Sequence, residues 1–243
     1  SYFKDLPFLR EAGGEARLEG NEFSLKVEQA QLTLPSGTDV ALSNGTMDAS
    51  NILAPETPAV FTFDAKAPIQ AVLEYLDQPA LGVIKRTGID SGKLGGGAAM
   101  SVSLKIPLVK GVTRDRIVVE AKARLENASL EGALPGIDLT KGNIAVTVAA
   151  GAITAEGPMK INGIDATVTW RREAGEGAKQ SAVIEATLDD KAREKIGAKL
   201  GDYLTGPVSV KATIPDLGNK EGGVEIDVNL AKAELRLAVI GWT

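Results

Sequence analysis

The amino-acid sequence predicts an all-β protein, mainly antiparallel, in which a curved, elongated β-meander forms a groove and two short helices lie at its periphery. Three observations support this. Apolar and polar residues alternate in short runs, and turn-forming residues interrupt the runs about every 8–12 residues. Only two stretches have helical periodicity. Two parts of the chain also resemble each other, as a sheet extended by duplication would.

In the N-terminal part, Ser24–Leu34 alternates loosely and ends at the turn residues that follow Leu34. Short strand signals at Val40–Leu42 and Thr46–Leu53 flank Asn44-Gly45, a dipeptide typical of two-residue hairpins. We therefore expect a hairpin there, and a further strand at Ala59–Ala65, where the alternation is regular.

Pro68 opens the first helical pattern, whose apolar residues recur at intervals of three and four as far as Leu76. Pro79 breaks or kinks this first helical stretch, and a short helix is expected to follow it at Ala80–Arg86. The glycine-rich stretch Gly92–Gly97 is interpreted as a flexible link into a strand at Ala98–Ile106. Strands are expected next at Ile117–Leu125 and Ile144–Val148, and then across a meander that ends at Leu188.

Asp189 or Asp190 is expected to cap the second helix, since a carboxylate can accept a hydrogen bond from a free N–H of the first turn. A pair of catalytic carboxylates is the less favoured interpretation of these two residues. The helix would present a stripe of four apolar side chains and end at a glycine; these residues are Ala192, Ile196, Leu200, Tyr203 and Gly206. Three closing strands are expected at Val208–Ile214, Val224–Leu230 and Ala233–Val239.

The internal repeat is marked by two Ile-Pro pairs about 108 residues apart, Ile106-Pro107 and Ile214-Pro215. The segments after them also match, at an offset near 105: Ile117–Leu130 resembles Val224–Leu235. We expect residues 1–243 to form one domain of a longer protein, with repeat units at about 59–135 and 182–243.

The composition limits the possible chemistry. The chain has no His and no Cys, which removes Ser-His-Asp triads, Cys-His dyads and His or thiolate metal sites. Glu225 and Asp227 share a strand face and could hold calcium, but no EF-hand loop surrounds them, so a solvated face is favoured. A net charge of −5 and 4% aromatic residues argue against nucleic-acid binding. We expect no enzyme activity, no cofactor and no metal.

Three segments resemble the AsmA-like superfamily of Gram-negative envelope proteins, nearest to its YhdP-type central region and more distantly to TamB. They are Leu76–Leu108, Ala186–Val210 and Leu230–Trp242. The resemblance implies a long β-sheet curled into a trough, with an apolar face that carries acyl chains across the periplasm. It also implies an anchor in the inner membrane upstream of this chain, and no catalytic residues.

The function expected is therefore non-enzymatic handling or conduction of phospholipid, or another envelope lipid, through an apolar groove. The alternative is a structural spacer that docks envelope partners and whose sheet faces close into a β-sandwich. If the groove exists, alternation predicts that its lining includes Val102, Leu104, Ile106, Ile117, Val119, Ala121, Ile144, Val146 and Val148.

Overall fold

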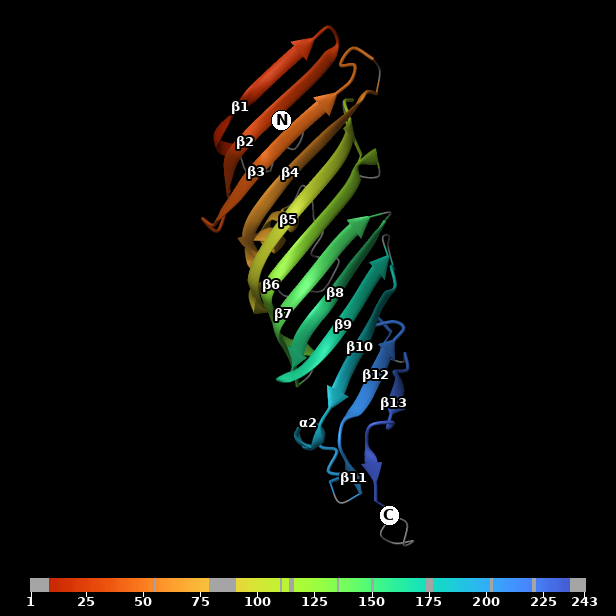
Figure 1. The fold of residues 1–243 in the computed structure, drawn as a ribbon. Helices are drawn as coiled ribbons and strands as arrows, with labels where there is room; N and C mark the ends of the chain where they lie inside the picture. The colour runs from red at the N-terminus through yellow and green to blue at the C-terminus, as the bar shows by residue number, and fades with distance from the viewer. Residues whose placement is uncertain are drawn as a thin grey trace.

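A computed structural model describes residues 9–54, 56–78, 91–109, 111–113, 116–134, 136–149, 151–173, 177–201, 203–219 and 222–236. Its main feature is one antiparallel sheet of twelve strands in the order β1 to β10, β12, β13. The sheet is curved and open, as expected, and it carries two short α-helices. In Figure 1 the strands follow one another in chain order from the red β1 to the blue β13.

The first half of the sheet consists of β1 (Leu9–Glu19), β2 (Glu22–Thr33), β3 (Asp39–Ala49), β4 (Pro58–Pro68), β5 (Leu94–Pro107) and β6 (Val118–Leu134). The second half consists of β7 (Ile137–Ala149), β8 (Ala152–Ile161), β9 (Ile164–Glu173), β10 (Gln180–Leu188), β12 (Val208–Ile214) and β13 (Glu225–Asn229). The short strands β11 (Leu204–Thr205) and β14 (Glu234–Leu235) pair with each other separately. In the described residues the sheet does not close into the sandwich of the alternative interpretation, since all strands except β11 and β14 belong to this one open sheet.

Two helices follow strands that run in the same direction. Helix α1 (Ile69–Leu76) follows β4 and α2 (Asp190–Lys195) follows β10, and a single turn η2 (Ser91–Lys93) precedes β5. Because neighbouring strands are antiparallel, β4 and β10 end at the same rim of the sheet. No helix of the described ranges is long and apolar enough to cross a membrane.

The hydrophobic core lies where α1 packs on the sheet. One buried cluster joins Ala71 of the helix to Leu32 and Val40, and a second joins Ile69 to Ala98. The helix therefore covers one face of β2–β6 near the rim. Elsewhere the sheet is a single layer in the described residues, which explains why few side chains are fully buried.

The expected Asn44-Gly45 hairpin is wrong, because β3 runs through it. Asn44 and Gly45 together oppose a single residue of β4, so the strand bulges there instead of turning back. Asn44 has a φ of 52°, and both a bulge and a tight turn use this left-handed conformation. The dipeptide alone does not distinguish the two.

The glycine-rich stretch before Ala98 is also not a link, since β5 begins at Leu94. Gly96 has a φ of +108°, and a Cβ there would lie 2.7 Å from the carbonyl oxygen of Glu126. Similarly, a Cβ on Gly157 of β8 would lie 2.1 Å from the carbonyl oxygen of Asn143 in β7. Glycine at these positions permits close backbone contact at irregular points of the ladder, and such irregularities bend a sheet.

The second helix is shorter than expected. It ends at Lys195, and Gly197 with a φ of 86° follows it in the position predicted for Gly206. Consequently Ile196, Leu200 and Tyr203 form no helical stripe and are exposed. Gly206 instead follows β11.

Two predicted elements fall wholly or partly outside the described residues. The expected helix at Ala80–Arg86 lies outside the described residues, as do the last three residues of the expected strand Ala233–Val239. Of that strand, the described part forms only β14, which is not in the large sheet. Strand β1 was not predicted, because its glycines and charged residues give no regular alternation.

Candidate apolar binding face

The strand register places apolar side chains on one face of the sheet across several strands. Val102 of β5 pairs with Ala121 of β6, and Ala121 pairs with Val148 of β7. Leu104 likewise pairs with Val119. Since directly paired residues point to the same side, rows of apolar side chains cross the sheet. We call this side the apolar face.

The nine residues predicted to line a groove all follow this parity. Eight of them lie within β5, β6 and β7, and Ile117 lies one position before β6. Ile144 is buried and Val119 is 43% exposed; the other seven are partly exposed. The register thus brings the three predicted sets together on one face, while their contact with a lipid stays a prediction.

The apolar face is larger than these nine residues. Phe61 of β4 pairs with Leu104 and also with Met47 of β3, and Met47 pairs with Leu25 of β2. On the other side, Ile184 of β10 continues the face into β12 and β13 through Ala212 and Ile226. The signal for these residues was the same alternation of apolar and polar side chains, which is regular in β4 but is interrupted in β3 by the bulge at Asn44-Gly45.

The opposite side of the sheet, the polar face, carries hydroxyl and charged groups. Thr46 and Thr62 share a hydrogen bond of 2.8 Å. Asp64 accepts hydrogen bonds from the Asn44 amide at 2.8 Å and from the Ser101 hydroxyl at 2.6 Å. These two bonds stabilise the carboxylate and lower the pKa of Asp64. This face needs no cover, because its groups are solvated or bonded to one another.

A hollow of about 660 Å³ lies at β8–β13. Most of its lining side chains belong to the polar face, including Thr167, Glu185, Lys211 and Asp227. Lys211 and Glu185 form an ion pair of 3.3 Å across it. None of the nine predicted lining residues contributes to this hollow, so it is not the groove that the sequence predicts.

Helix α1 covers the part of the apolar face that lies at the rim of β2–β6. Its Glu74 carboxylate accepts a hydrogen bond of 2.8 Å from the backbone N–H of Ser36, which ties the helix to the β2–β3 turn. Tyr75 packs against the first core cluster, and burial raises the pKa of its hydroxyl. The helix leaves the rest of β5–β7 uncovered in the described part of the chain.

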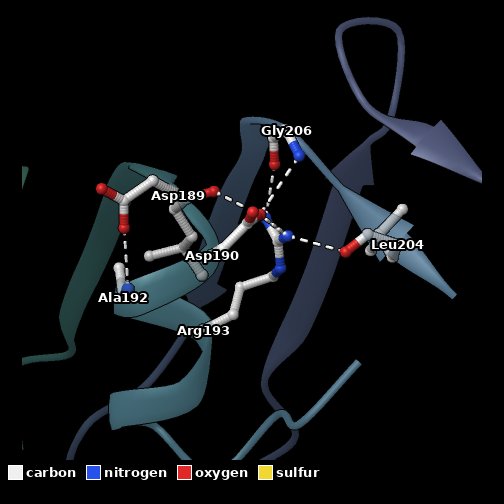
Figure 2. A network of polar contacts seen from close by, with 7 residues as sticks. Asp189, Asp190, Ala192, Arg193, Leu204 and Gly206 are labelled. Atoms are coloured by element: carbon white, nitrogen blue, oxygen red, sulfur yellow. Dashed lines mark hydrogen bonds and ion pairs between the residues drawn. The ribbon is translucent and has the colours of Figure 1, made fainter. Parts of the chain in front are cut away.

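Helix α2 is held by a polar cluster on the same rim (Figure 2). Arg193 is only 4% exposed and pairs with Asp190. Its guanidinium also donates to the carbonyl oxygens of Leu188 at 3.0 Å, Leu204 at 3.0 Å and Gly206 at 2.5 Å. The cluster therefore joins β10, α2 and β11.

The expected helix cap is confirmed. The Asp189 carboxylate accepts a hydrogen bond of 2.7 Å from the N–H of Ala192, while Asp190 accepts one from the N–H of Gly206 at 3.1 Å. Both carboxylates thus have structural partners. Sequence reasoning did not identify Arg193, because two of its three carbonyl partners lie 11 and 13 residues further along the chain, beyond the helix itself.

In comparisons with known proteins, no family model, no curated protein and no solved structure matches the chain.

Proposed function

We propose that the chain is a non-enzymatic segment of an envelope protein that handles lipid by sheltering acyl chains on its apolar face. The observation that supports the proposal is an apolar face that crosses the sheet and, in the described residues, has no second layer over the part of β5–β7 that α1 leaves uncovered. An uncovered apolar surface of this extent normally marks an interaction site.

The length of the apolar face suits a path along which an acyl chain moves better than a pocket that encloses one. Twelve strands spaced about 4.8 Å apart make the sheet roughly 50 Å long. One leaflet of a bilayer has a hydrocarbon depth of about 15 Å, so the face is longer than one extended acyl chain. Each CH₂ group transferred from water onto the face gains about 0.8 kcal/mol.

The side chains also suit a mobile acyl chain. Around Val119 the face is formed by aliphatic residues, chiefly Val, Leu, Ile and Ala, and no charged residue pairs into its rows between β5 and β7. Such a surface contacts hydrocarbon without selecting one headgroup. On the resemblance to AsmA-like proteins, we propose that this activity belongs to the periplasm and that the protein is anchored in the inner membrane upstream of this chain.

The proposal is tested by purifying the protein without detergent and recording native mass spectra. Co-purified phospholipid supports it. Reproducible absence of lipid, together with no uptake from phospholipid vesicles, would favour a spacer that docks envelope partners.

Photo-crosslinking then locates the contact. A photoreactive residue at position 119 should label acyl chains, whereas one at position 120 should not, because Glu120 pairs with Ser103 on the polar face. Equal labelling at the two positions would remove the assignment of the lipid to the apolar face.

A further inference from the structure

The two end strands of the large sheet have different edges. β13 pairs with β12 over five successive residues without a register shift. β1 has two register irregularities, and Glu11 within it has a φ of 51°. Bulges make an edge unsuitable for another strand, whereas a regular apolar edge accepts one. Among the described residues no strand pairs with the outer edge of β13 (Figure 1).

The internal repeat shows what such an edge accepts elsewhere in this molecule. In the first unit Val102 of β5 pairs with Ala121 of β6, and in the second Val210 of β12 pairs with Val228 of β13. If Val210 corresponds to Val102, at the spacing of the two Ile-Pro pairs, the strand register places Val228 at the position of Ala121. This offset of 107 residues replaces the offset near 105 that sequence similarity alone indicates.

The equivalent position in the first unit is covered. On its other side Ala121 pairs with Val148 of β7, and Ala123 pairs with Val146. Ala121 is partly buried there, whereas Val228 is 55% exposed and Ile226 is 62% exposed. The edge of β13 thus resembles the edge of β6 with its neighbouring strand removed.

We propose that the outer edge of β13 is a strand-addition site, which binds an antiparallel β-strand with β-branched apolar side chains at alternate positions, as β7 does on β6. The apolar side chains of the added strand would continue the apolar face beside Val228. Its intervening polar side chains would lie beside Glu225 and Asp227 on the polar face. Backbone hydrogen bonds supply the affinity and the alternating side chains select the orientation. The site is independent of the proposed lipid binding.

The absence of cysteine from the chain allows a direct test. The probe is a synthetic peptide with the sequence of residues 142–149, GNIAVTVA, in which the residue equivalent to Val148 is Cys. With the Val228→Cys protein, it should form a disulfide at least about tenfold faster than the same peptide carrying Cys in place of Thr147, because adjacent residues point to opposite faces. The Asn229→Cys protein should show the reverse preference, since its equivalent residue Lys122 pairs with Thr147.

A second measurement uses the unmodified protein. Hydrogen exchange with the cysteine-free peptide should slow at 225–229 and stay unchanged in β1, and a peptide with N-methylated backbone groups should have no effect. Absence of protection, or equal cross-linking rates in both pairings, would overturn the proposal. A pairing of β13 with β1 of a second copy would also overturn the proposal. It would appear as a molecular mass of the protein that grows with its concentration, together with a disulfide between the Val228→Cys and Ala16→Cys variants.

Discussion

At the scale of single residues, the polar contacts that matter most are those with no access to water. Arg193 is the clearest case, because its buried guanidinium is satisfied by one carboxylate and three carbonyl oxygens from two separate parts of the chain, residues 188–190 and 204–206. Asp64 is the opposite case: its two hydrogen bonds lie on the open polar face, so solvent limits their contribution to stability.

We predict that Arg193→Met destabilises the C-terminal part of the sheet by about 3 kcal/mol, because it leaves buried carbonyl groups and the Asp190 carboxylate without their partner. Urea unfolding measures the loss. Lys191→Met, on the exposed side of the same helix, is the control and should change stability by less than about 0.5 kcal/mol. Equal effects of the two variants would contradict the role given to Arg193.

For Asp64 we predict an NMR titration midpoint below the ordinary aspartate value, since hydrogen bonds from Asn44 and Ser101 favour the carboxylate. A pKa lowered by folding stabilises the protein above the unfolded pKa, and this contribution is lost as the pH falls through the folded pKa. Ser101→Ala should move the midpoint upward. A midpoint that does not change in this variant would show that the bond is not formed in solution.

At the scale of elements, side-chain alternation determines which face a residue occupies, and this could be read from the sequence. Val119 and Glu120 lie on opposite faces because neighbouring residues of a strand always do. The positions of the β-bulges could not be predicted from this alternation. Asn44-Gly45 permits a bulge as readily as a hairpin, and the difference is decided by pairing with β2 and β4.

The length of α2 illustrates the same limit. Ile196, Leu200 and Tyr203 have helical spacing, but a helix of this kind persists only where its apolar stripe packs on a surface. No such surface lies beside them in the described residues, and the chain leaves the helix at Gly197. The cap at Asp189 could be predicted because it involves only local groups.

We predict that Gly157→Ala destabilises the sheet by more than about 1 kcal/mol, because an alanine there would have an unfavourable φ and a Cβ too close to the Asn143 carbonyl. Gly97→Ala is the control, since a Cβ at that position meets nothing within 4 Å. Thermal melting should show a lower Tm for the first variant alone. Equal Tm values would mean that β7 and β8 do not approach each other so closely in solution.

At the scale of the whole molecule, the open or closed state of the sheet could not be deduced from periodicity. A sandwich and an open meander require the same alternation, and they differ only in whether a second sheet covers the apolar side. In the structure, each strand of the large sheet pairs with its neighbours in chain order, and only α1 packs extensively on the apolar face among the described elements. The order β4, α1, β5 is similar to the order β10, α2, β11, β12, and β4, β5, β10 and β12 all lie in this one sheet.

The central claim, that the apolar face binds acyl chains, is tested most directly by two matched substitutions, Val119→Asp and Val118→Asp. The two valines are neighbours with 43% and 54% exposure, and they lie on the apolar and polar faces respectively. The measurements are the Tm of each variant and the transfer of a fluorescent-acyl phosphatidylethanolamine between vesicles.

We predict that both variants melt near the parent Tm, since neither position is enclosed, and that only Val119→Asp loses lipid transfer, by about tenfold or more. An unpaired carboxylate on the apolar face opposes contact with hydrocarbon by several kcal/mol. Equal transfer by the two variants would contradict the claim, and a large fall in Tm for Val119→Asp alone would show that the face is a closed core.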